Sequence, residues 1–321
     1  MELLQCPDDR GYPVEYLLSR IRGRRSELIR DWKALIFDLA SLDRHVPARS
    51  RIGMSDTAPE AAWRRLMIEY RWVYGQMNGK LRETFKLFFL YAELRTLFIC
   101  LRQMRDKKSA RFEALLEESL LSDEIRSIFL KAADVPMAVA GISRIFSSLS
   151  TAFADLQERY EEGGIRMVER RMTNAYLAYA VETTTHPLMK AFFIRMVDAR
   201  NIIRLAESVR QESATPPDFI AEGSIPLPQL TAIQQQRDLL ATAALVRAYA
   251  GAKIDQPDPA QVEHALYAGT TRMLKRAGRE PSGIGPILDY LWRCSIEAMN
   301  LSILFYGKDI ERELISAELV A

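Results

Sequence analysis

The chain has 321 residues, and its 44 Lys and Arg against 42 Asp and Glu give a formal net charge of +2. This balance argues against a nucleic-acid-binding protein, because proteins of that class typically carry an excess of basic residues. With 27% charged and 48% hydrophobic residues, the composition also excludes an intrinsically disordered chain and indicates a core in two or three packed units.

The N-terminal part of the chain predicts two short helices and a cluster of positive charge. Met1–Tyr12 has neither a basic start nor an apolar stretch, so it is not a signal peptide. Pro13–Ile29 predicts a helix, because proline suits a first turn and apolar residues follow at helical spacing. Trp32–Leu42 predicts a second helix. The first one carries a basic run that forms either a solvated face or a contact surface for an anionic partner: Arg20, Arg22, Arg24 and Arg25.

The next part of the chain predicts a loop and then long helices. Arg44–Glu60 contains two prolines, one glycine and two serines, which predicts a loop. Ala61–Tyr74 returns to helical spacing. The most apolar window, Phe85–Leu101, is interrupted by two basic residues and one acid, and is therefore too charged to span a bilayer.

Helical spacing continues to the C-terminus. Further helices are predicted at Ile142–Tyr160, Met167–Val181, Leu227–Ala250, Pro259–Ala277 and Gly285–Gly307. Gly163-Gly164 predicts a bend. No alternating run of β-branched residues is long enough to require a sheet. The predicted fold class is therefore all-α.

Three helical segments share an acid followed, three positions later, by a hydroxyl or amide residue. These positions lie on one helix face, together with apolar residues four and seven positions after the acid. The acids are 198 − 93 = 105 and 297 − 198 = 99 residues apart, which predicts three similar helical units, 1–108, 109–215 and 216–321. The six positions are Glu93 with Thr96, Asp198 with Asn201, and Glu297 with Asn300.

Few residue patterns in the chain carry chemistry. The three histidines have no metal-ligand spacing, and no phosphate-binding or nucleophile motif occurs. Cys6, Cys100 and Cys294 are far apart, which favours reduced thiols over a disulfide. The repeated acids are either general acid/base groups or hydrogen-bond acceptors that fix the register of a neighbouring helix. Three equivalent positions in three units favour the second interpretation, so catalytic residues, cofactors and metals are predicted to be absent.

Spaced residues in four segments are shared with a known family. Near the C-terminus they are Pro286, Tyr290, Glu297, Asn300, Leu301, Gly307 and Lys308. Val197–Leu205 carries a D-x-x-N-I pattern, Phe219–Ile225 carries F-I-x-x-G-x-I, and Tyr16–Ile21 carries Y-L-x-x-R-I. Together these motifs resemble the C-type subunit family of V-type ATP synthases, which includes the d-type subunit of eukaryotic V-ATPases. Thr96 departs from the family pattern, which has asparagine there.

The resemblance implies both a fold and a role. The implied fold is three similar helical units around a pseudo-threefold axis, in the form of a funnel. The implied role is that of a non-catalytic rotor subunit in the central stalk of a V/A-type rotary ATPase. Such a subunit links axle subunits of the D and F type to the membrane proteolipid ring, transmits torque for ATP-coupled proton or sodium transport, and lies peripherally at the cytoplasmic face. It uses no small-molecule substrate, cofactor or nucleic acid.

Two other classes of protein are alternatives. A generic all-α scaffold or interaction protein of the solenoid type has repeats of about 20–50 residues, shorter than the spacing between the acids in this chain. An all-α enzyme requires a cavity with clustered carboxylates and a bound metal.

Overall fold

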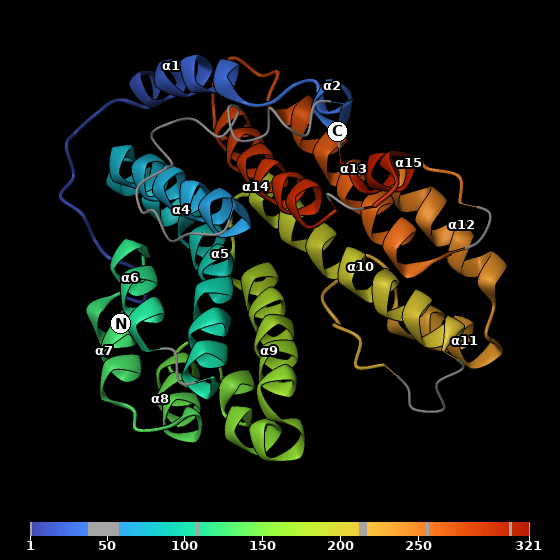
Figure 1. The fold of residues 1–321 in the computed structure, drawn as a ribbon, viewed down its shortest axis with the longest axis horizontal. Coiled ribbons are helices and arrows are strands. Elements are labelled where there is room, and N and C mark those ends of the chain that lie inside the picture. The colour runs from blue at the N-terminus through green and yellow to red at the C-terminus, as the bar shows by residue number, and fades with distance from the viewer. Residues whose placement is uncertain are drawn as a thin grey trace. The chain divides into compact units, whose positions relative to one another are not determined.

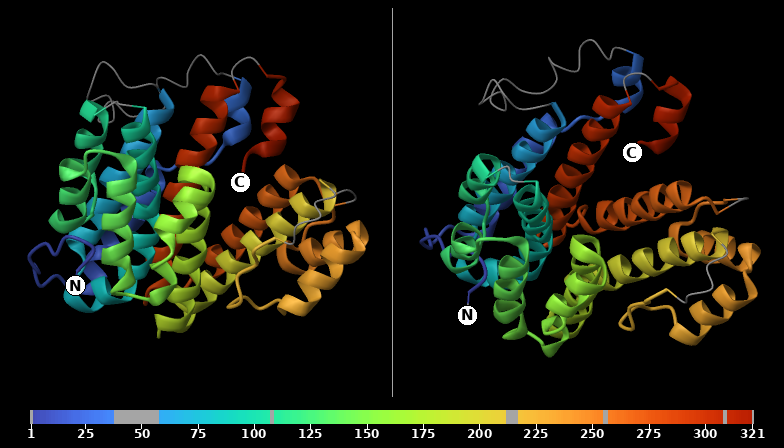
Figure 2. Two further views of the ribbon diagram at one scale, coloured as in Figure 1. Left: turned by 90° about the horizontal axis from the view of Figure 1, so that it is seen from below. Right: turned by 60° about the horizontal axis from the view of Figure 1, so that its bottom comes forward.

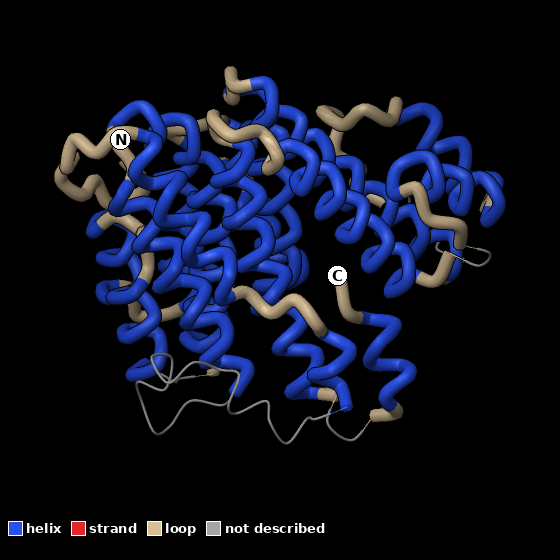
Figure 3. Tube along the Cα trace, turned by 90° about the horizontal axis from the view of Figure 1, so that it is seen from above, coloured by secondary structure: helices blue, strands red, loops and turns tan. Residues whose placement is uncertain are grey.

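The computed structural model describes residues 2–37, 58–106, 109–211, 217–254, 257–307 and 310–320. Within these ranges every regular element is helical, apart from one isolated antiparallel bridge between Leu4 and Leu121 (Figure 3). The predicted all-α fold class is therefore confirmed.

The chain divides into two compact units. The first consists of Met1–Gly11 and Tyr74–Val197, and the second of Tyr12–Val73 and Asp198–Ala321. The division falls inside α4 (Ala58–Gln76) and inside α10 (Pro187–Arg210). The plan of three units and the pseudo-threefold funnel stay predictions.

In the first unit, α5 (Gly79–Arg105) packs along α9 (Leu156–Thr183), and α8 (Val135–Ser147) contacts both helices (Figure 1). This unit also contains α6 (Ser109–Glu118) and α7 (Asp123–Lys131). Its core is rich in aromatic side chains, and the rings of Phe88 and Phe192 lie 5.7 Å apart. Asn78 starts α5, because its side chain accepts a hydrogen bond from the Leu81 amide at 3.0 Å.

The helix predicted at Ile142–Tyr160 is wrong, because α8 ends at Ser147 and α9 begins at Leu156. Hydroxyl groups compete with the helix here: Ser148 Oγ donates to the Ile145 carbonyl, and Ser150 Oγ accepts from the Ala152 amide. The bend predicted at Gly163-Gly164 is confirmed. Both glycines leave helical geometry, and Gly164 has a φ of 66°, which a residue with a Cβ rarely adopts.

The second unit contains α4 up to Val73, α10 from Asp198 onward, and further helices on both sides of them in the sequence. These are α1 (Val14–Arg24), α2 (Trp32–Phe37), α11 (Leu227–Gln236), α12 (Leu239–Ala250), α13 (Pro259–Ala277), α14 (Gly285–Tyr306) and α15 (Arg312–Glu318). Helix α13 packs against α12 and α14, while α15 lies beside α2 (Figure 2). The helix predicted at Pro259–Ala277 matches α13 at both ends.

Two predicted helices in the second unit differ from the structure, one by an internal break and one by an earlier end. Leu227–Ala250 is two helices, because Arg237 adopts a left-handed φ of 52° and the Asp238 side chain caps α12 through the Ala241 amide. The helix predicted at Pro13–Ile29 ends at Arg24 and continues only as the 3₁₀ turn Arg25–Glu27.

Two predictions fall partly outside the described residues. Within the loop predicted at Arg44–Glu60, positions 44–57 lie outside them, whereas α4 already begins at Ala58. Of the helix predicted at Trp32–Leu42, the described part, Trp32–Phe37, is helical.

Gly285 begins α14 at a close approach to α13. A Cβ at this position would lie 2.3 Å from the carbonyl oxygen of Ala277, which is a backbone atom and cannot rotate away. The turn that joins α13 to α14 therefore requires glycine at this position.

Gly285→Ala is expected to lower the free energy of unfolding by about 1–3 kcal/mol, since the added methyl group forces the backbone apart. Gly23→Ala in α1 is the matched control, because no atom lies within 4 Å of its Cβ position. This control is expected to be neutral or to stabilise by roughly 0.4–1 kcal/mol. Urea unfolding measures both changes, and a Gly285→Ala chain that unfolds at the wild-type midpoint contradicts the close approach.

Candidate functional site

The three repeated carboxylates are buried in three of the longest helices. Glu93 lies in α5, Asp198 in α10 and Glu297 in α14, and their residues are 0%, 0% and 6% exposed. A buried carboxylate loses its hydration and needs hydrogen-bond donors from the protein. In all three cases a backbone N–H from outside the helix supplies one.

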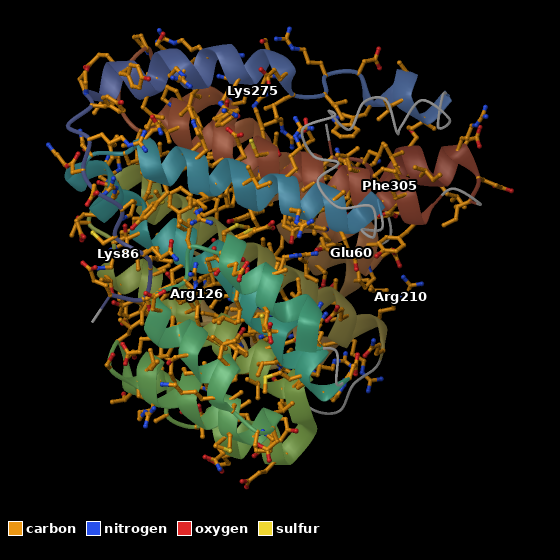
Figure 4. The ribbon with its side chains drawn as sticks, turned by 60° about the vertical axis from the view of Figure 1, so that its left-hand side comes forward. Glu60, Lys86, Arg126, Arg210, Lys275 and Phe305 are labelled. Carbon is orange, nitrogen blue, oxygen red and sulfur yellow. The ribbon has the colours of Figure 1, made fainter. Side chains whose placement is uncertain are left out.

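Glu93 holds the turn between α6 and α7. Its Oε1 accepts a hydrogen bond of 2.6 Å from the Leu120 amide, and burial raises the pKa of Glu93 to about 7. The same turn binds the N-terminal segment, because the backbone N–H of Gln5 donates to the Leu120 carbonyl at 2.7 Å. Arg126 of α7, which Figure 4 labels, donates to the Ser119 carbonyl at 2.7 Å. One buried carboxylate thus fixes the turn that also receives residues from the chain start.

Asp198 holds the loop that precedes α11. It accepts hydrogen bonds from the Ser224 amide at 2.8 Å, from Ser224 Oγ at 2.5 Å and from the Ile225 amide at 3.3 Å. Burial raises the pKa of Asp198, and these hydrogen bonds offset that increase only in part. The carboxylate thus accepts hydrogen bonds from both the backbone and a side chain of the loop before α11.

Glu297 holds a segment from the start of the second unit. It accepts a hydrogen bond of 2.8 Å from the Ile29 amide, and its other oxygen lies 3.2 Å from Arg65 Nη1 of α4. Burial raises the pKa of Glu297, whereas the Arg65 charge and the Ile29 amide lower it. Glu297 thereby connects α14 to α4 and to the segment after α1.

The amides three positions after two of the acids each bind both backbone groups of one residue. Asn201 Nδ2 donates to the Ile220 carbonyl at 2.8 Å, and its Oδ1 accepts from the Ile220 amide at 2.9 Å. Asn300 binds Val320 in the same way, at 2.7 and 3.1 Å. Thr96 occupies this position in the first segment and is buried. Its single hydroxyl group lacks the separate carbonyl and NH₂ groups with which an asparagine binds both the N–H and the C=O of one residue. The three segments therefore share the acid contact more closely than the amide contact.

Two of the four arginines at the start of the chain form ion pairs inside the second unit. Arg24 Nη1 lies 2.6 Å from Glu69 Oε2, and its guanidinium lies 3.8 Å from the centroid of the Trp72 ring. Arg25 Nη2 lies 2.5 Å from Oδ2 of the fully buried Asp289. These two side chains bind α4 and α14.

The other two arginines are exposed on α1. Arg20 donates to the hydroxyl of Tyr16 at 2.7 Å, and Arg22 donates to the Pro281 carbonyl at 2.8 Å. A partner-binding role for the set Arg20, Arg22, Arg24 and Arg25 stays a prediction.

The sequence pattern missed a second row of polar residues in the second unit. Asp289 of α14 pairs with Arg25 and, at 2.9 Å, with Arg293, while the Tyr290 hydroxyl donates to Glu69 at 2.7 Å. The signal for Asp289 was its position eight residues before Glu297, since positions i and i+8 fall within one broad stripe along a helix. Glu69 and Arg65 gave no comparable signal, because their partners are far away in the sequence.

A surface hollow of about 330 Å³ lies in the first unit beside the start of α5. The N-terminal segment uses its charged groups: Arg82 donates to the carbonyls of Pro7 and Asp8, and Asp9 Oδ2 accepts from the Gly79 amide at 2.9 Å. Lys86, labelled in Figure 4, also lines the hollow. These hydrogen bonds attach residues 7–9 to the start of α5.

The part of the chain that the structure describes lacks both a metal-binding cluster and a membrane-spanning helix. No three His, Cys, Asp or Glu side chains gather there into a group that could hold a metal ion. No described helix has both the length and the apolar character needed to cross a bilayer. Of the three thiols, Cys100 and Cys294 are buried and Cys6 is exposed.

One comparison with known proteins gives a match. A family model described as ATP synthase (C/AC39) subunit matches residues 52–317. The matched region contains all three repeated acids and begins after the four arginines. No curated protein matches the chain.

Asp198→Ala is expected to lower the free energy of unfolding by about 2–4 kcal/mol, because the Ser224 and Ile225 donors lose a charged acceptor. Asp198→Asn keeps one acceptor oxygen and is expected to lose less. Glu207→Ala is the matched control, since Glu207 is an exposed acid on the same helix. The three changes are compared by denaturant unfolding, and equal midpoints for Asp198→Ala and Glu207→Ala argue against the role of Asp198 in holding the loop before α11.

Glu93→Gln is expected to change how stability depends on pH. The pKa of Glu93 is about 7 in the folded chain against 4.5 as its ordinary value, so the folded state holds the proton more tightly. Stability from this group is therefore full below pH 4.5 and falls as the pH rises through about 7. The glutamine cannot ionise, so at pH 8 the variant is expected to gain up to about 3 kcal/mol over wild type.

At pH 4.5 this advantage of Glu93→Gln should be absent. Glu83→Gln is the control, because Glu83 lies on the same helix with its side chain 75% exposed. Urea unfolding at a series of pH values measures the difference, and a constant offset between Glu93→Gln and wild type would falsify the proposed titration.

Proposed function

Since the chain belongs to the ATP synthase (C/AC39) subunit family, we propose that it is a non-catalytic central-stalk subunit of a V/A-type rotary ATPase. In this role it is a rotor socket that links axle subunits of the D and F type to the membrane proteolipid ring. It transmits torque for ATP-coupled proton or sodium transport, as a peripheral protein on the cytoplasmic face of the membrane.

The observation that carries this proposal is the family match over residues 52–317, which takes in most of both units. The geometry of the buried acids agrees with a mechanical role. Glu93 and Asp198 bind backbone amides of their own unit, so their oxygens hold loops in place. A general acid or base needs instead to reach a reacting group on a substrate.

A torque-transmitting socket needs long elements that do not slide against their connections. Helices α5 and α10 have 27 and 24 residues, and each carries near its middle one of the buried acids that hold a separate segment, which we call anchors. Each anchor ties a loop to its helix through short hydrogen bonds in a poorly hydrated site, where such bonds are strong. The tied loops resist displacement when force acts on the helix.

The socket also needs two interfaces that survive torque, each on the order of 1,000 Å² or more. Exposed charges at the rim of an interface speed association and make it sensitive to salt. Arg20 and Arg22 are the basic side chains on α1 that fit this description, because both are exposed. Arg24 and Arg25 contribute indirectly, by fixing α1 and the turn after it to α4 and α14.

Reconstitution of the rotary complex with and without this chain tests the proposal. Without the chain, the soluble head is expected to keep hydrolysing ATP, while hydrolysis-driven ion transport is lost, because the axle and the ring are uncoupled. Adding back the wild-type chain should restore transport, as should the exposed-acid control Glu207→Ala.

Transport and hydrolysis are measured on the same vesicles, so that their ratio is known. A normal ratio in the absence of the chain rules out the coupling role and leaves a helical scaffold as the function. Micromolar binding of ATP or a divalent metal by the isolated chain, measured by calorimetry, contradicts the non-catalytic assignment.

A further inference from the structure

The third acid differs from the other two in where its partner lies. Glu93 and Asp198 bind amides 27 and 26 residues later in the chain, at Leu120 and Ser224. Glu297 binds the amide of Ile29, which is 268 residues earlier. A distant segment therefore occupies on α14 the place that the following loop occupies on α5 and α10.

This segment, Arg25–Phe37, contacts α14 near its start, its middle and its end. Arg25 pairs with Asp289, Ile29 donates to Glu297, and α2 packs beside Phe305, which Figure 4 labels. Phe305 lies sixteen positions after Asp289, and sixteen helical rises span about 24 Å. We refer to Arg25–Phe37 as the clasp.

The end of the clasp buries apolar side chains in a shared cluster. Trp32, Leu35 and Ile36 of α2 are 8%, 5% and 3% exposed. Their neighbours in the cluster come from α4, α14, α15 and the residues after α15: Ala62, Leu301, Leu304, Phe305, Ile315 and Leu319. A helix of six residues is not stable alone in water, so α2 depends on this cluster for its structure.

The preceding helix α1 is attached by contacts of its own. Leu17, Leu18 and Ile21 are buried, and Arg24 pairs with Glu69. Between α1 and α2 the chain passes through a single 3₁₀ turn and then extended backbone at Leu28, with ψ at 142°. The clasp therefore begins directly after α1, and its first residues, Arg25–Leu28, interrupt the α-helical backbone between α1 and α2.

We propose that the α4, α14 and α15 surface is a segment-binding groove whose occupant is the chain's own clasp, which docks and releases while the rest of the second unit stays folded. In the bound segment, Asp289 recognises an arginine, and Glu297 recognises a backbone N–H four residues after that arginine. The apolar part of the groove recognises side chains three, six and seven residues after that N–H. Release of the clasp uncovers two carboxylates and an apolar pocket on α14. This site does not depend on the proposed function.

Hydrogen exchange on the full-length chain tests whether the clasp opens by itself. Peptides covering residues 25–37 are expected to exchange together, faster than those from α1 and α14, because clasp opening needs less than unfolding of the unit. Glu297→Gln removes the charge that the Ile29 amide faces and is expected to speed exchange in the clasp about tenfold. Glu263→Gln, an exposed acid on α13, is the matched control and should change nothing.

Capture of a labelled peptide with the sequence of residues 25–37 tests the groove itself. A full-length chain carrying Trp32→Ala and Leu35→Ala has a weakened clasp and is expected to bind the peptide at least tenfold more tightly than wild type, measured by fluorescence anisotropy. Adding Glu297→Gln to this chain should weaken capture about tenfold, whereas Glu263→Gln should not. A scrambled peptide of the same composition is the second control.

Circular dichroism and exchange in α12 and α13, which belong to the second unit but not to the clasp, show whether each variant is folded. The proposal is overturned if the amides of residues 25–37 exchange only when the whole second unit unfolds. It is also overturned if the folded Trp32→Ala, Leu35→Ala chain does not bind the peptide, or if this chain binds the scrambled peptide equally well.

Discussion

The structure depends on one kind of contact, a buried carboxylate in a long helix that accepts a backbone N–H from a loop. Both sides of this contact are unfavourable when left alone, because a buried charge loses hydration and a buried amide loses its water partner. Together they compensate each other and fix one residue of the loop against one turn of the helix. At Asp198, Ser224 and Ile225 of one loop supply three hydrogen bonds to a single carboxylate.

The three anchors are related but not equivalent. Glu93 accepts the Leu120 N–H at 2.6 Å and has a pKa raised to about 7 by burial, whereas Glu297 gains the positive charge of Arg65 at 3.2 Å. The neighbouring amides of Asn201 and Asn300 each bind one residue by its N–H and C=O. The pattern in the sequence is therefore a recurrent way to attach a segment to a helix, and the attached segments differ.

Helix α14 has a special place in the second unit because it carries polar contacts along most of its length. Asp289, Tyr290, Glu297 and Asn300 bind, in that order, the turn after α1, helix α4, the Ile29 amide and Val320. These partners come from both ends of the sequence. A single helix thus contacts segments that are distant in the sequence, which agrees with the proposed socket role and with the proposed release of the clasp.

The sequence by itself determined the helices, the recurrent acids and the family, because all three are expressed in local spacing: apolar residues at helical offsets, and an acid with an amide one turn later. It could not determine which group each acid binds. The Ile29 N–H lies 268 residues from Glu297, and nearly every residue type carries a backbone N–H, so the residue type of the donor does not reveal the hydrogen bond. The ends of α8 and α11 escaped prediction for a related reason, because hydroxyl groups and a left-handed Arg237 compete with helical spacing. Only the tertiary structure placed Arg25 on Asp289 and the clasp on α14, because such pairings arise when the chain folds back and buries charges and apolar surface together.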